Sequence, residues 1–353
     1  MIDRIFRWRP GGPLLGLLSL LALFFLLLYL RGQLGNFCSL ANLQVLLHKN
    51  SILAIAALGM LLIIISGGID LSVGSVVALV TVVTMQCYRL LHDGSQASLP
   101  GWLADWFNQA GWNWGGLRSP FWPSVVAVLA GLAVACLCGL INGLVITRLR
   151  VVPFVATLGM LSLARGLAVW LAGRTRISFS GRRPEWVDDF SRTSSDWLIF
   201  SPGIYLAALL AVLVFVLLRF TILGRYTYAI GSSEATARLC GVPVERTRLV
   251  IYSLAGLLIG VAGILLFVHG NGGDPNAAVG LELDVIAAVV IGGASLSGGQ
   301  GTVGGTLLGV LILGVLENGV SLFDVPVEVK YVLIGVIVVV NTALGNWQRR
   351  RGQ

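Results

Sequence analysis

Side chains that could do catalytic chemistry are few and scattered in this chain of 353 residues. It has three histidines, His48, His92 and His269, and none is a neighbour of another. Neither the His-Glu-x-x-His pattern of zinc hydrolases nor the Gly-x-Ser-x-Gly pattern of serine hydrolases occurs. We therefore expect no catalytic residue, no metal site and no cofactor.

Nucleotide chemistry is also not expected from this chain. Its two lysines, Lys49 and Lys330, do not lie in the Gly-x-x-x-x-Gly-Lys-Ser/Thr loop that cradles a triphosphate. If ATP drives this protein, another chain must bind the ATP.

Two charged residues lie within or beside apolar segments, where a charge is costly and usually faces a cavity or a partner. Asp70 lies in Gly67-Gly68-Ile-Asp70-Leu-Ser72, and we favour a role in capping a helix that begins near Leu71. Arg165 is more isolated. Its sequence leaves two interpretations open: it bridges segments or lines a path, or it snorkels to the membrane interface.

An internal echo connects the Asp70 segment with a later one. The pattern Gly-Gly-x-x-Leu-Ser-x-Gly occurs at 67–74 and again at 292–299, each time after an aliphatic run. Transporters are often built from internal repeats whose broken helices meet at the substrate path, although a Gly-rich chain can produce such an echo by chance. Our candidate path residues are Gly67, Gly68, Asp70, Ser72, Arg165, Gly292, Gly293 and Ser297.

A polar stretch, Gly231–Pro243, carries the signals of a short surface helix between two apolar segments. Ser232 or Ser233 can cap its start, and Glu234 complements the positive helix end. Gly241 suits the left-handed residue after the last turn, and Pro243 prevents further helix. We expect about eight helical residues, roughly 12 Å of helix. Because Arg225, Arg246 and Arg248 flank it, we expect it to face the cytoplasm and to dock a partner there.

The elements that position these residues are membrane helices. Hydrophobic residues make up 56% of the chain and charged residues 11%, against about 25% charged in soluble domains. We expect an all-α polytopic membrane protein, a single permease domain over 1–353, with about ten spans and some short, broken helices. The expected segments are Leu14–Leu30, Ile52–Ser66, Val73–Leu91, Pro123–Thr147, Val151–Ala172, Ser201–Arg219, Leu249–Val268, Val285–Ala294, Gly301–Leu316 and Val329–Leu344.

The net charge of +8 fits membrane anchoring better than nucleic-acid binding, because the arginines lie mostly between apolar segments and at the two ends. We expect both termini and the 220–248 loop in the cytoplasm of a plasma (inner) membrane protein. The 92–120 and 173–200 loops would lie outside, although the second is rich in arginine. The tryptophans of the first suit an aromatic belt, or alternatively a docking or sugar-stacking surface.

Several motifs resemble the permease subunits of ribose/xylose/galactose-type sugar ABC importers, which have a type II importer-like fold. They occur in order along nearly the whole chain, at Gly67–Gly74, Phe154–Met160, Arg165-Gly166, Leu223–Gly231, Ser233–Val244, Gly280–Ala288 and Ile291–Thr302. The resemblance implies a homodimer with two cytoplasmic ATP-binding subunits and an extracytoplasmic sugar-binding protein. It also implies a coupling helix contacting the ATPase, with Gly231, Ser233, Glu234, Ala235, Arg238 and Gly241 as candidate residues.

The chain departs from the resembled pattern in two places. The 91–120 loop is longer, and residues 231–234 read Gly-Ser-Ser-Glu where Gly-Gly-Asn-Glu or Gly-Ser-Asn-Glu is common. Three alternatives stay open: a related permease for a branched-chain amino acid or a nucleoside, an ion-coupled secondary transporter, and a receptor or scaffold without transport. An ion-coupled carrier would need titratable groups at mid-membrane, and only Asp70 and Arg165 are candidates.

Overall fold

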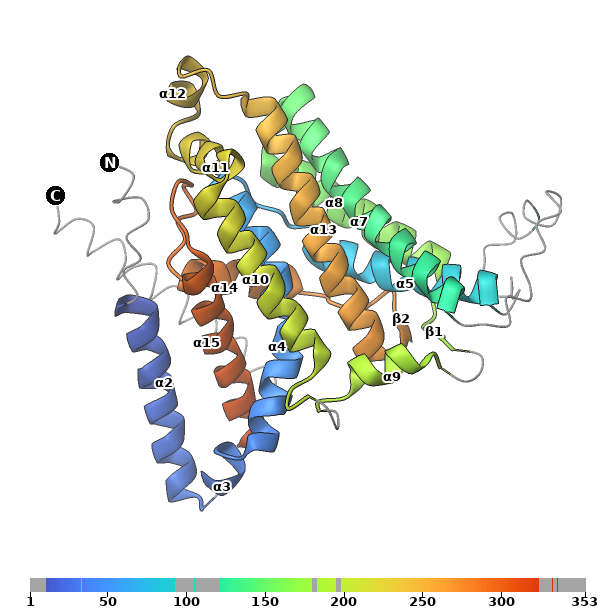
Figure 1. The fold of residues 1–353 in the computed structure, drawn as a ribbon, viewed down its shortest axis with the longest axis vertical. Coiled ribbons are helices and arrows are strands. Elements are labelled where there is room, and N and C mark those ends of the chain that lie inside the picture. Colours follow the sequence, from blue (N-terminus) through green and yellow to red (C-terminus); the bar gives the residue numbers. More distant parts are fainter. Residues whose placement is uncertain are drawn as a thin grey trace. The chain divides into compact units, whose positions relative to one another are not determined.

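The computed structural model describes residues 11–32, 34–92, 105, 121–179, 183–194, 198–323, 332 and 335. Within these ranges, eight helices are long and apolar enough to cross a membrane, which confirms a polytopic helical protein (Figure 1). Most of the expected last span, most of the 92–120 loop and both charged termini lie outside the described residues. The expected span at 285–294 is instead a helix of 11 residues, too short to cross the hydrocarbon core.

The described contacts divide the chain into two compact units, each assembled from separate stretches of sequence. Unit 1 comprises Met1–Gly68, Ile204–Thr247 and Leu283–Gln353. Unit 2 comprises Ile69–Gly203 and Arg248–Glu282.

Unit 1 is built on α15, which packs against α4 and α2. Small residues allow this: Gly314 of α15 faces the Asn50 amide, and Gly319 faces the ring of Phe24. An amide pair, Asn42 with Asn318, joins α4 to α15 with hydrogen bonds of 3.0 and 2.8 Å. The helices of unit 1 are α2 (Gly11–Leu30), α3 (Leu34–Phe37), α4 (Leu40–Ile65), α10 (Pro202–Phe220), α11 (Ile222–Ser232), α12 (Glu234–Leu239), most of α14 (Leu281–Ile291) and α15 (Val303–Leu322).

Unit 2 is built on α5, which packs against α7 and α8. A short antiparallel pair, β1 with β2, places Ile177 opposite Gly273 and joins the chain after α8 to the chain after α13. The elements of unit 2 are α5 (Val73–His92), α7 (Phe121–Arg148), α8 (Pro153–Leu171), β1 (Ile177–Ser178), α9 (Glu185–Ser191), α13 (Val244–Gly270, its first four residues in unit 1) and β2 (Gly272–Gly273).

Helices α7 and α13 approach each other through glycines spaced four residues apart on each helix. A Cβ on Gly139 of α7 would lie 3.1 Å from the Cα of Gly256, and a Cβ on Gly256 would lie 2.5 Å from the Ala135 carbonyl oxygen. Membrane helices lack a hydrophobic drive to associate, so small residues that let backbones approach closely contribute much of the packing energy.

We predict that Gly139→Ala lowers the melting temperature of the detergent-solubilised protein, because overpacking a close contact costs about 1–3 kcal/mol. The matched control is Gly159→Ala in α8, where an added Cβ has nothing within 4 Å. Both changes gain the same helix propensity, so the control should melt at or above the wild-type temperature. Equal melting temperatures for the two variants would contradict the proposed packing of α7 on α13.

Candidate functional site

The polar stretch between α11 and α13 forms the expected short helix, α12, with both ends capped. Ser233, not Ser232, is the N-cap: its hydroxyl accepts a hydrogen bond from the Thr236 N–H at 3.3 Å. The Ser232 hydroxyl instead donates to the Tyr228 carbonyl. The helix has six residues where about eight were expected, because Ser233 and Cys240 are caps rather than helical residues.

At the C-terminal end of α12, Gly241 has a φ of +78°, as its sequence context predicted. The Gly241 N–H donates to the Arg238 carbonyl and the Val242 N–H to the Ala237 carbonyl, both at 3.0 Å. These two bonds define a Schellman cap, which needs a left-handed residue at the glycine. The helix therefore has a fixed length and a fixed exit direction.

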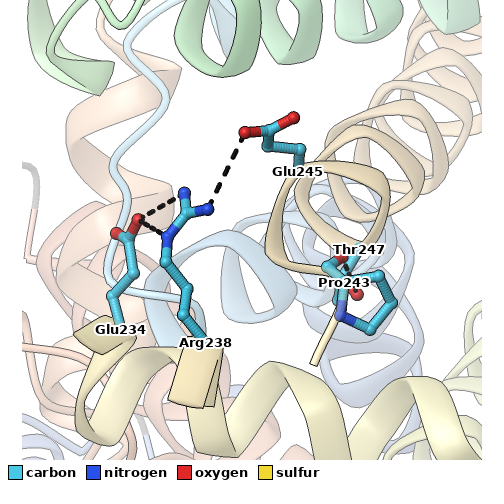
Figure 2. Close-up of polar contacts among 5 residues, drawn as sticks. All are labelled: Glu234, Arg238, Pro243, Glu245 and Thr247. Carbon is cyan, nitrogen blue, oxygen red and sulfur yellow. Dashed lines mark hydrogen bonds and ion pairs between the residues drawn. The ribbon is translucent and has the colours of Figure 1, made fainter. Parts of the chain in front are cut away.

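Charged groups on α12 pair within this segment (Figure 2). The Arg238 guanidinium lies 3.0 Å from the Glu234 carboxylate, one turn back on α12, and 3.7 Å from the Glu245 carboxylate in the first turn of α13. All three side chains are exposed enough for each pair to contribute only a few tenths of a kcal/mol. Their effect is to hold α12 against the start of α13.

Beneath α12, a small apolar cluster of Ile230, Ala237 and Val244 joins the end of α11, α12 and the start of α13. Leu239 of the same helix is not part of this cluster and is 90% exposed. Such an exposed leucine on a capped helix is a candidate contact for a partner protein. Leu239 was not singled out from the sequence, where the cap residues flanking it were the available signal.

The end of α11 meets two of the expected glycine motifs within unit 1. A Cβ on Gly298 would lie 2.9 Å from the Cα of Gly67 and 3.0 Å from the Cα of Gly231, so the three backbones touch. The Gly299 N–H donates to the Ile65 carbonyl, at the end of α4, at 2.9 Å. We call Gly67, Gly231 and Gly298 the glycine junction.

A tyrosine fixes one side of this junction. The Tyr228 hydroxyl on α11 donates to the Gly301 carbonyl at 2.7 Å. Burial raises the pKa of Tyr228 to about 12, so its hydroxyl stays protonated and remains a donor at neutral pH. The last turn of α11, which leads into α12, is thereby bonded to the 292–301 loop.

Both segments of the internal echo follow a helix that ends in the same kind of cap, but the caps differ by one residue from the sequence alignment. Helix α4 ends in a Schellman cap with Gly67 at φ +83°, and α14 ends in the same cap with Gly293 at φ +93°. The sequence pattern aligns Gly67 with Gly292 instead. Of the other expected path residues in unit 1, Gly292 packs closely against Gly305, whereas Ser297 is exposed.

Unit 2 holds a buried polar group around Asp70, which is 2% exposed. One Asp70 carboxylate oxygen accepts from the Ser72 N–H at 2.8 Å and from the Ser72 hydroxyl at 2.6 Å. The Asn142 amide of α7 donates to the same hydroxyl at 3.3 Å. Asp70 thus orders the turn before α5, which begins at Val73 rather than near Leu71. Asn142 was missed, although it is a lone amide in an apolar run.

Arg165 of α8 bridges segments, the first of its two interpretations. One of its guanidinium nitrogens donates to the Pro275 carbonyl at 2.7 Å and to the Ala277 carbonyl at 2.9 Å. The loop it holds also lies against α5, because a Cβ on Gly74 would overlap the Ala278 carbonyl. Arg165 therefore secures the loop between β2 and α14.

The structure divides the expected path residues between the two units. Gly67, Gly68, Gly292, Gly293 and Ser297 belong to unit 1, whereas Asp70, Ser72 and Arg165 belong to unit 2. Among the described residues, no group of three His, Cys, Asp or Glu side chains is placed to hold a metal ion.

Comparison with known proteins agrees with this architecture. A family model described as branched-chain amino acid transport system / permease component matches residues 42–341. The ribose import permease of Escherichia coli (strain K12) is 33% identical over 328 residues, covering 93% of this chain and 92% of the relative. The ribose import permease of Bacillus subtilis (strain 168) is 34% identical over 341 residues, covering 94% and 91%.

The fructose import permease of Rhizobium meliloti is 30% identical over 327 residues, covering 90% of this chain and 81% of the relative. No solved structure matches the chain. The resemblance drawn from the motifs is confirmed, because the family match and the sugar permeases span most of the sequence. The similar relatives are sugar import permeases, and the chain belongs to the branched-chain amino acid transport system / permease component family.

Proposed function

We propose that this chain is the membrane permease subunit of an ABC importer that translocates a monosaccharide. The observation that carries the proposal is α12, a short helix with two fixed caps and an exposed leucine, joined directly to the glycine junction. The ribose, fructose and L-arabinose permeases among its relatives support a monosaccharide as the solute. The family description supports a branched-chain amino acid as the alternative solute.

In this proposal two copies of the chain assemble with two cytoplasmic ATP-binding subunits, and a sugar-binding protein delivers the solute from outside. Positive residues near α12 (Arg225, Arg246 and Arg248) favour the cytoplasmic side for that helix. Both termini lie on that same side, and the loops at 92–120 and 173–200 lie outside. The whole chain forms a single permease domain. It neither binds nor hydrolyses ATP itself.

The ATP-binding subunit receives α12 in an apolar cleft that buries Leu239. Moving a leucine from water into such a cleft contributes about 1.5–3 kcal/mol. Glu234 and Arg238 neutralise each other on α12. They therefore stabilise the helix and contribute less than Leu239 to contact with the ATP-binding subunit. Gly231, Ser233 and Ala235 set the helix start, and Gly241 sets its end.

Movement of α12 reaches the membrane helices through the glycine junction. The apolar cluster under α12 fixes it to α11, and Gly231 at the end of α11 touches Gly67 and Gly298. Gly67 follows α4 and Gly298 follows α14, and each of these two helices ends in a glycine cap. Such caps are sites where a chain changes direction without side-chain strain. From Gly68 the chain continues to Asp70 and α5, which extends the effect to the candidate path residues.

Gly241→Val should uncouple ATP hydrolysis from transport, because a β-branched residue is strained at φ +78°. No atom lies within 4 Å of the added Cβ, so strain is the only direct effect. The stimulation of ATPase activity by sugar-loaded binding protein should be at least about fivefold smaller in this variant than in wild type. The control is Gly241→Asn, which tolerates the left-handed region and should keep most of the stimulation. Full stimulation in Gly241→Val would refute the role of the cap.

Leu239→Asp should release the ATP-binding subunits, weakening their binding about thirtyfold, as expected for a central anchor worth about 2 kcal/mol. Co-purification of the ATPase with membranes or detergent-solubilised permease measures this. The control is Cys240→Ser, at the neighbouring exposed cap residue. This variant should retain the ATPase as well as wild type does. Wild-type co-purification of Leu239→Asp would mean that the partner binds elsewhere.

Asp70→Asn separates this proposal from ion-coupled transport. The asparagine oxygen can still accept from Ser72, so ATP-driven uptake should stay within about threefold of wild type, a loss of under 1 kcal/mol. Asp70→Leu leaves the buried Ser72 groups without an acceptor, which costs about 1–3 kcal/mol. Loss of uptake in Asp70→Asn, with normal amounts of folded protein, would instead indicate that the carboxylate must titrate.

A further inference from the structure

Unit 1 contains a cavity of about 470 Å³ that the coupling function does not use. It lies between α10, α11 and the start of α15. Its volume is within the range of about 300–1,000 Å³ that is typical of small-molecule sites.

The walls of this cavity are almost entirely apolar. Ala211, Phe215 and Leu218 of α10 and Leu307 of α15 line it. From residue 211 to 219, α10 rises about 12 Å, which gives the depth of the apolar wall. Phe215 is 49% exposed and lies on a helix with the length and apolar character of a membrane span. The cavity therefore opens toward lipid, and an occupant would reach it from the bilayer.

One end of the cavity is positive. Arg219, in the last turn of α10, lines it beside Tyr228 and the first residues of α15. The Thr302 hydroxyl and carbonyl accept from the Gly305 and Thr306 N–H groups. That leaves the N–H groups of Val303 and Gly304 without a helical acceptor, at the positive end of a 20-residue helix. A guanidinium and a helix end together complement a negative group.

We propose that this cavity binds an anionic phospholipid of the cytoplasmic leaflet, with its acyl chain against α10 and its phosphate beside Arg219. An apolar wall about 12 Å deep that ends in a cation matches the order of groups in such a lipid. The assignment to the cytoplasmic leaflet rests on the proposed function, which places the α10–α12 end of unit 1 in the cytoplasm. Because α11 forms one wall and leads into α12, an occupied site would stabilise the segment that couples to ATP hydrolysis.

Native mass spectrometry of the full chain, extracted from vesicles of equal phosphatidylglycerol and phosphatidylcholine, tests the proposal. Wild type should retain phosphatidylglycerol preferentially. Arg219→Gln should lower that preference about fivefold, equal to about 1 kcal/mol for one basic residue at a charged surface. Arg225→Gln, on an exposed residue of α11 that does not line the cavity, should retain the wild-type preference.

A second variant, Ala211→Leu, fills the apolar part and should reduce retention of both lipids. Unchanged phosphatidylglycerol preference in Arg219→Gln would overturn the proposal. The proposal would also be overturned if Ala211→Leu left lipid retention intact but changed the fraction of dimer. The cavity would then be a contact between two copies of the chain. Neither ATPase nor sugar is present in this measurement, so failure of the coupling proposal would not alter its result.

Discussion

The contact on which the described structure most depends is the meeting of three backbones at Gly67, Gly231 and Gly298. No side chain fits between them, since a Cβ on Gly298 would lie within 3.0 Å of both other Cα atoms. Backbone contact without side chains transmits displacement directly, because there are no rotamers to absorb it. The segments that meet are the end of α4, the end of α11 and the loop after α14.

In the proposed mechanism, this constraint links an exposed six-residue helix to helices within the membrane. Helix α12 is fixed at both ends and bonded through its apolar underside to α11. Tyr228 then connects α11 to the loop that contains Gly298. In unit 2, Asp70 and Arg165 have a different part: each uses hydrogen bonds to hold a backbone segment next to α5. Asp70 and Arg165, which were candidate path residues, therefore have structural roles.

Local features were predictable from sequence, and long-range contacts were not. The caps of α12 follow from short-range chemistry, so Glu234 and Gly241 could be placed without a structure, whereas the N-cap was narrowed only to Ser232 or Ser233. The echo at 67 and 292 was found, but with two adjacent glycines at 292 and 293 the sequence does not say which adopts positive φ. The glycine junction joins segments more than 60 residues apart, and glycine has no side chain to show a contact pattern. Asn142 was overlooked because an isolated polar residue in an apolar run gives no indication of its partner. Tyr228 lies within the Leu223–Gly231 motif, but its bond to Gly301 joins segments 73 residues apart, which the sequence does not reveal.

Coupling through the glycine junction can be measured as the number of sugar molecules imported per ATP hydrolysed in proteoliposomes, compared between wild type and Gly231→Ala. The ratio is independent of how much protein is active. A methyl group at Gly231 would overlap the Ile65 carbonyl and separate the three backbones. We predict that the variant still assembles with its ATPase and hydrolyses ATP but imports far less sugar per ATP. An unchanged ratio would contradict the claim that coupling passes through the glycine junction.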